Sequence, residues 1–213
     1  MLSPDGVLYF SANASATLIG VVAESGPANS SWAMYRKNPK HHGNAAGLPG
    51  DWHWDVVSGF SVDASPASDG AGRLWMAMNG QLQAFHPDGT VAVPPVEGLF
   101  ADQGPIIGDP DTLWMASIAG YNPARSELVA YDTKDLRLLS RLPLDGFVPH
   151  RASMALASDG TVYVGTALEG AGGRLYATNA TTGFYRAWNL PRPVVNAPVL
   201  RGDSVVLVAA EYI

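Results

Sequence analysis

Cysteine is absent from the 213-residue sequence. Its absence excludes disulfide bonds, thiolate-bound metals, iron–sulfur clusters and a cysteine nucleophile. The cellular compartment stays open, because a chain without cysteine is compatible with oxidising and with reducing surroundings.

Charge is also scarce. Asp, Glu, Lys and Arg make up 15% of the residues, the formal net charge is −6, and Lys and Arg form no run. A nucleic acid or an anionic membrane surface requires a basic patch, so we expect neither as a partner. No segment approaches the roughly 18 to 20 consecutive apolar residues of a membrane span. Residues 1–10 show no basic region ahead of an apolar one, so the sequence predicts no membrane insertion and shows no signal peptide.

Glycine and proline are abundant, with 23 Gly and 16 Pro, and 47% of the residues are hydrophobic. This composition favours turns and buried strands over charged helices, and the chain is long enough to bury a substantial core. Segments such as residues 161–164 and 205–208 are rich in β-branched and aromatic residues. With no convincing amphipathic helix, the sequence predicts an all-β protein.

The strongest signal is an internal repeat. Each unit begins with a small residue and usually Pro, and a pair of aliphatic, or aliphatic and aromatic, residues follows at a constant interval. The copies are Ser65-Pro66 with Leu74-Trp75, Gly104-Pro105 with Leu113-Trp114, Ser153-Met154 with Val162-Tyr163, and Ala197-Pro198 with Val206-Leu207. Successive units begin about 40 to 50 residues apart, the length of a four-stranded β-propeller blade.

A third landmark, Leu-x-Ala or Leu-x-Gly, closes the hairpin after a turn and recurs four times. Its copies are Leu18-Ile19-Gly20, Leu82-Gln83-Ala84, Leu128-Val129-Ala130 and Leu175-Tyr176-Ala177. Residues 5–9 match residues 159–163, so the chain begins inside a blade, and it also ends inside one. We therefore predict an incomplete β-propeller with three fairly complete four-stranded blades and two partial ones, with the remaining blades in a parent chain.

The same landmarks divide the chain. Residues 1–31 are predicted to form a partial blade, and residues 32–56 a Trp-rich connecting segment. Residues 57–213 are predicted to hold three blades and the start of another, all within one propeller domain.

Residues 159–164 (Asp-Gly-Thr-Val-Tyr-Val), 173–177 (Gly-Arg-Leu-Tyr-Ala) and Thr182-Gly183 resemble the pyrroloquinoline-quinone-like propeller repeat. Residues 32–43 are similar to a segment that flanks many bacterial propellers of this kind. The resemblance implies a propeller in which a Trp docks onto the next blade, and Trp188 lies near that position.

Members of this family include quinone-dependent dehydrogenases, outer-membrane assembly scaffolds, kinase-attached sensors and parts of secreted adhesive proteins. The resemblance implies that a dehydrogenase holds pyrroloquinoline quinone between a Trp and a vicinal disulfide, with Ca²⁺ and an Asp base beside it. That disulfide cannot form here, and no convergent set of Asp, Glu and Asn residues occupies the matching positions. We therefore expect no cofactor.

The polar candidates for a metal site have simpler interpretations. His41 and His42 are adjacent, and neighbours on an extended chain point to opposite sides, so with His53 they are interpreted as surface residues rather than a metal site. Residues 109–111 (Asp-Pro-Asp) could contribute to a Ca²⁺ site, but their place in the repeat indicates a hairpin turn.

No phosphate loop, nucleophile elbow or carboxylate pair at hydrolase spacing is present, so we assign no catalytic residue. Trp75 and Trp114 recur at the hairpin landmark and are predicted to pack in the core. Aromatic rings can bind a sugar or a peptide, and the candidates for such a surface are Trp32, Trp52, Trp54 and Tyr121. The segments at residues 119–126 and 168–173 differ in length from their counterparts in the other units. They are predicted to be loops that contribute to the binding surface.

The sequence thus favours a non-catalytic propeller in the bacterial envelope or outside the cell that binds a protein or a glycan. One alternative is a fragment of a pyrroloquinoline quinone and calcium-dependent dehydrogenase whose other ligands lie elsewhere. A second alternative is the sensor domain of a larger signalling protein.

Overall fold

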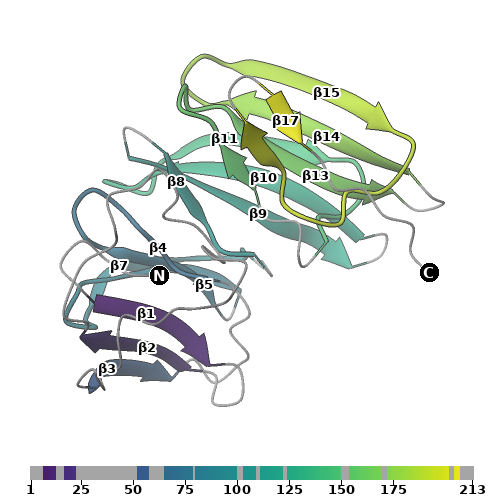
Figure 1. Ribbon diagram of the computed structural model, residues 1–213. Coiled ribbons are helices and arrows are strands. Elements are labelled where there is room, and N and C mark those ends of the chain that lie inside the picture. Colours follow the sequence, from purple (N-terminus) through teal and green to yellow (C-terminus); the bar gives the residue numbers. More distant parts are fainter. Residues whose placement is uncertain are drawn as a thin grey trace. The chain divides into compact units, whose positions relative to one another are not determined.

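The computed structural model describes residues 7–12, 17–22, 52–57, 65–78, 80–99, 103–108, 111–121, 124–149, 154–168, 172–201 and 204–206. In the first three ranges it describes the backbone alone. The chain divides into two compact units, residues 1–97 and residues 98–213. All the elements of the described residues are β-strands (Figure 1).

The first unit contains two antiparallel sheets. One is three-stranded, with the order β1-β2-β3, and the other is four-stranded, with the order β4-β5-β6-β7. Their strands are β1 (Val7–Ala12), β2 (Thr17–Val22), β3 (Trp52–Val57), β4 (Ala67–Ser68), β5 (Leu74–Met78), β6 (Gln81–Phe85) and β7 (Val91–Glu97).

The second unit contains two four-stranded sheets, β8-β9-β10-β11 and β12-β13-β14-β15, and the hairpin β16-β17. The strands are β8 (Ile106–Gly108), β9 (Thr112–Tyr121), β10 (Ala124–Asp132), β11 (Leu138–Leu144), β12 (Ala155–Leu156), β13 (Val162–Leu168), β14 (Gly172–Asn179), β15 (Phe184–Leu190), β16 (Val199–Arg201) and β17 (Ser204–Val206).

The strands follow the sequence repeat. The first strand of each blade begins directly after a unit start, so that β4 follows Pro66, β8 follows Pro105 and β12 follows Met154. The aliphatic-aromatic landmark lies in the second strand and Leu-x-Ala in the third. The prediction of three four-stranded antiparallel blades is confirmed, and the described strands before and after them form a three-stranded sheet and a hairpin.

Aromatic and aliphatic side chains of the repeat form the core. Trp75 and Trp114 are 0% and 1% exposed, which confirms that they pack inside. In the second unit a continuous apolar cluster joins the two complete blades, with Trp114 and Leu128 from one and Val164 and Tyr176 from the other. Facing sheets that bury such residues against each other define blade packing.

Two predicted segments differ from the structure. The predicted connecting segment, residues 32–56, ends in a strand, because β3 pairs with β2 along Trp52–Val57. The predicted loop at residues 119–126 is largely strand, because β9 extends to Tyr121 and β10 begins at Ala124. Cross-strand pairing continues to the end of this hairpin, so little of it is free to act as a loop.

Candidate functional site

The turn between β4 and β5 is organised by one buried carboxylate. Oδ1 of Asp69 accepts hydrogen bonds from the backbone N–H groups of Ala71 (3.0 Å) and Arg73 (2.9 Å). Oδ2 accepts from Nε of Arg73 (2.7 Å) and from Nε1 of Trp75 (2.8 Å). Every donor around the carboxylate belongs to the same hairpin, so the charge holds the turn and the Trp75 ring in place.

A second polar cluster links the two complete blades of the second unit. The backbone N–H of Asp145 donates to the hydroxyl of Tyr176 (2.8 Å), and the Asp145 carboxylate pairs with the Arg174 guanidinium. Burial raises the pKa of Tyr176 above its ordinary value. Phe147 and Ala167 add a β-bridge between the blades. These contacts fix one blade on the next.

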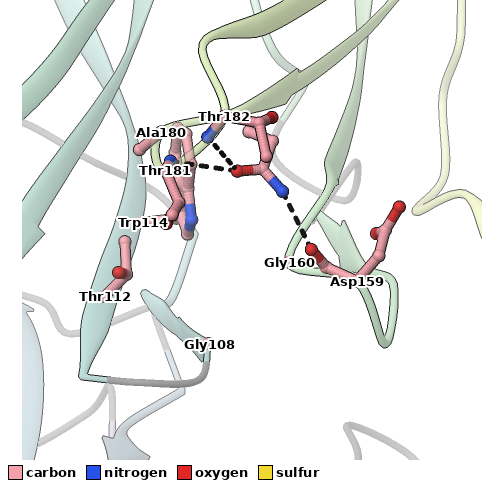
Figure 2. A pocket seen from close by; sticks show the side chains of 9 residues that line it. Gly108, Thr112, Trp114, Asp159, Gly160, Ala180, Thr181 and Thr182 are labelled. Atoms are coloured by element: carbon pink, nitrogen blue, oxygen red, sulfur yellow. Dashed lines mark hydrogen bonds between the residues drawn. The ribbon is translucent and has the colours of Figure 1, made fainter.

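A small cavity opens where turns of the same two blades meet (Figure 2). It measures about 140 Å³. Its lining residues come from the β8–β9 region and from the β12–β13 and β14–β15 turns: Gly108, Thr112, Trp114, Asp159, Gly160, Asn179, Ala180, Thr181 and Thr182. Pockets for small-molecule ligands usually measure about 300 to 1,000 Å³, so this cavity is smaller than a typical ligand pocket.

Asn179 and Asp159, which line the cavity, already bond to groups of the chain. Oδ1 of Asn179 accepts from the backbone N–H groups of Thr181 and Thr182 (3.0 Å each), and its Nδ2 donates to the Asp159 carbonyl oxygen (2.9 Å) (Figure 2). The backbone N–H of Thr161 donates to the Asp159 carboxylate and lowers the pKa of that group. Asn179 therefore ties two turns together and has little capacity left for a ligand.

The outermost strands of the three complete blades differ in how well they are protected. β7 contains Pro94 and Pro95, and β11 contains Pro143. The pairing of both strands with their neighbours is interrupted by register shifts. β15 has the sequence Phe-Tyr-Arg-Ala-Trp-Asn-Leu, without proline, and it pairs with β14 with no shift. Proline and bulges blunt sheet edges, and β15 has neither.

β15 is the outermost strand of its sheet (Figure 1), and it carries exposed aromatic side chains. Phe184 and Tyr185 are 44% and 53% exposed. The Arg186 guanidinium lies 4.8 Å from the centre of the Trp188 ring, a cation–π contact. We call residues 184–190 the β15 strip. Of this strip only Trp188 was assigned a position from the sequence, although two adjacent aromatic residues in a segment without proline are a signal for the strip that the sequence itself contains.

Trp188 lies at an informative position in the repeat. It pairs with Leu175, as Leu142 pairs with Leu128 in the preceding blade. Leu142 packs against the apolar cluster between the two blades. Trp188 therefore occupies the repeat position of Leu142, near the position that the family resemblance implies for a docking Trp.

The residues predicted for a binding surface are only partly described. Trp32 lies outside the described residues, as do His41 and His42. Trp52 and Trp54 belong to β3 of the first unit, and Tyr121 ends β9 of the second, with only backbone described for all three. Whether they form a surface stays a prediction.

Asp111, the described member of the Asp-Pro-Asp segment, lies in the β8–β9 turn with φ of 72° and pairs with Lys134 (2.9 Å). Within the described part of the chain, no three His, Asp or Glu residues form a group that could hold a metal ion. The described ranges also contain no helix long and apolar enough to cross a membrane.

The family resemblance implies pyrroloquinoline quinone for dehydrogenases, and the expectation that this chain binds no such cofactor stays a prediction. Trp75 is enclosed by the core, and Trp114 is almost fully buried and lines only the small cavity described above. The vicinal disulfide that would cover the other face of the quinone requires cysteine, and the sequence has none.

Comparison with solved structures defines the fold class as a β-propeller. The WD40 domain of coronin from Toxoplasma gondii has a TM-score of 0.58 at 14% identity, covering 91% of this chain and 46% of that one. A quinohemoprotein alcohol dehydrogenase from Pseudomonas putida has a TM-score of 0.59 at 14% identity, covering 89% of this chain and 33% of that one. A gluconolactonase from Xanthomonas campestris has a TM-score of 0.56 at 14% identity, covering 96% of this chain and 66% of that one.

The chain therefore spans less than half the length of the coronin domain and of the dehydrogenase. Identity at this level shows the fold alone, and the fold serves both binding proteins and enzymes. No family model and no curated protein matches the sequence.

Proposed function

We propose that this chain is a non-catalytic β-propeller scaffold, built from repeats of the pyrroloquinoline-quinone type, that binds a partner protein in the bacterial envelope or outside the cell. The observation that carries the proposal is the β15 strip, where Phe184 is exposed on the same face of the strand as the Arg186–Trp188 pair and Tyr185 is exposed on the opposite face. Aromatic residues and Arg are the types most enriched at protein interfaces. A strand edge adds backbone donors and acceptors that a protein partner can use.

The conspicuous polar side chains of the described blades support a structural role. Asp69, Asn179 and Gln103 are all buried, and each is engaged by groups of the chain itself. Gln103, for example, donates to the carbonyl oxygens of Val148 (3.3 Å) and Pro149 (2.8 Å). Side chains used in this way hold turns and blade connections and present no reactive group to a substrate.

The proposed binding of a partner protein is tested by immobilising the chain and its variants on beads and comparing the proteins that each captures. Wild-type protein, the double variant Phe184→Ser/Tyr185→Ser and the control Val91→Ser are incubated with a bacterial envelope extract, and captured proteins are identified by mass spectrometry. Val91 is a matched control because it is 58% exposed on another outermost strand. Loss of a protein with the double variant and retention with the control supports the proposal, whereas equal capture by all three contradicts it.

The non-catalytic half needs a direct assay. The purified chain is mixed with pyrroloquinoline quinone and Ca²⁺ and supplied with alcohols or aldoses, and dye reduction is recorded. A second assay follows the hydrolysis of gluconolactone. Turnover in either assay overturns the proposal. Binding of chito-oligosaccharides that quenches tryptophan fluorescence and is lost in the double variant would replace the protein partner with a glycan.

A further inference from the structure

Among the outermost strands of the complete blades, β15 has a sequence that complements itself. If two copies of Phe184–Leu190 run antiparallel about Ala187, Arg186 of each copy lies opposite Trp188 of the other. Phe184 then lies opposite Leu190, and Tyr185 opposite Asn189. Directly opposite residues in an antiparallel pair lie on the same face of the sheet, so each of these pairs is in contact.

Charge supports this register. Arg186 is the only charged residue of β15, so no like charges meet across the pair. Its guanidinium already lies over the Trp188 ring within one chain, and the paired arrangement repeats the contact between chains in both directions. Cation–π pairs and cross-strand aromatic pairs each stabilise such a ladder.

The edge is also available. β14 is the only strand paired with β15 among the described residues. Unlike β7 and β11, β15 has no proline or register shift to prevent a further strand from pairing. An isologous contact of this kind closes as a two-fold dimer and does not propagate into a fibre.

We propose that β15 pairs antiparallel with β15 of a second copy of this chain, centred on Ala187, and so joins two four-stranded blades into one sheet. The inference rests on the proposed function, because it names the partner of the β15 strip. Two seven-residue strands form a small contact, of the size class below about 1,200 Å² that gives weak and reversible complexes.

Sedimentation velocity over a concentration series tests the dimer with the whole chain. Wild-type protein should pass from monomer to dimer as concentration rises. Trp188→Arg places arginines opposite each other at two points and should weaken the dimer roughly tenfold or more. The exchange Arg186→Trp/Trp188→Arg restores the opposition of Arg and Trp and should recover association. Circular dichroism and thermal unfolding establish that each variant is folded.

Oxidative cross-linking tests the register. Because the chain has no cysteine, Ala187→Cys introduces a single thiol. In the proposed pair the two substituted positions are directly opposite, about 4.5 to 5.5 Å apart at Cα, which is within disulfide range. Tyr185→Cys is the control, because the two copies of position 185 are offset by four residues along the strands, roughly 13 Å.

Cross-linked dimer with Ala187→Cys and none with Tyr185→Cys is the expected result. A monomer at all concentrations, cross-linking of the control alone, or no recovery in the exchanged variant overturns the inference. The wild type could stay monomeric while the double variant Phe184→Ser/Tyr185→Ser fails to capture an envelope protein that the wild type captures. In that case the β15 strip binds a different partner, and the proposed dimer is wrong while the proposed function stands.

Discussion

Leu136 and Gly183 occupy the same place in the turns that precede the outermost strands of two successive blades. Both have positive φ, 56° and 70°. The Leu136 N–H donates to the Asp132 carbonyl oxygen and the Gly183 N–H to that of Asn179, each at 2.9 Å. The two turns therefore share one backbone conformation, which glycine adopts freely and leucine only with strain.

Leu136→Gly should consequently be more stable than Leu136→Ala by about 1 kcal/mol, because both lose the same side-chain packing and only alanine keeps the strained φ. Urea unfolding measures the difference in the free energy of unfolding. Gly183→Ala is the mirror test and should lower that free energy by a similar amount, since a Cβ at this position meets nothing within 4 Å. Equal stability of the two Leu136 variants would contradict the argument.

Asp69→Ala should lower the free energy of unfolding by about 3 to 5 kcal/mol. The change leaves the Arg73 guanidinium and the Trp75 indole N–H without their acceptor, in a place where the carboxylate is fully buried. The experiment is urea unfolding followed by tryptophan fluorescence. Asp88→Ala is the matched control, because Asp88 makes similar turn contacts with Thr90 at an exposed position. Its stability should stay close to that of the wild type.

Gly165→Ala should destabilise the blade formed by β12–β15, because the added Cβ would overlap the side chain of buried Val194. The expected loss is about 1 to 3 kcal/mol. Gly172→Ala in the next strand is the control, and it should be neutral or slightly stabilising, since its Cβ would make only ordinary contacts. Unfolding in urea gives both values.

The same pair permits a double-mutant cycle. Val194→Gly alone removes a fully buried side chain and should also destabilise. Combined with Gly165→Ala it opens the space that the new methyl group needs, so the double variant should be more stable than the sum of the two losses predicts, by about 1 kcal/mol. Simple additivity would mean that the two residues do not compete for the same space.

Periodicity in the sequence was sufficient to predict the blades. Pro66 and Pro105 precede first strands, Trp75 and Trp114 are buried, and the Leu-x-Ala landmark lies in third strands, because blade packing imposes the same requirements in each unit. The last unit departs by one residue. Val199 pairs with Val206, whereas its equivalent Ile106 pairs with Trp114, so the final hairpin is shorter than the constant interval predicted.

The candidate surface was harder to predict. An isolated Trp looks the same in sequence whether it packs, as Trp75 does, or lies partly exposed, as Trp188 does. The exposure of Phe184 and Tyr185 depends on β15 being the outermost strand of a regular blade, which is a property of the assembled sheet. Only when the order of strands is known does the absence of proline from β15 indicate a sheet edge that is open to pairing with a further strand.

Tyr176→Phe should change how stability depends on alkaline pH. Burial raises the pKa of Tyr176 in the folded chain, so the folded state favours the neutral phenol. That contribution is complete below the unfolded value of about 10 and is lost as pH rises through that value toward the folded pKa. At neutral pH the variant should be less stable, because the Asp145 N–H loses its acceptor. The difference in the free energy of unfolding between wild type and variant should narrow as pH rises above about 10.

Urea unfolding at several pH values measures that difference. A difference between wild type and Tyr176→Phe that stays constant with pH would contradict the assignment.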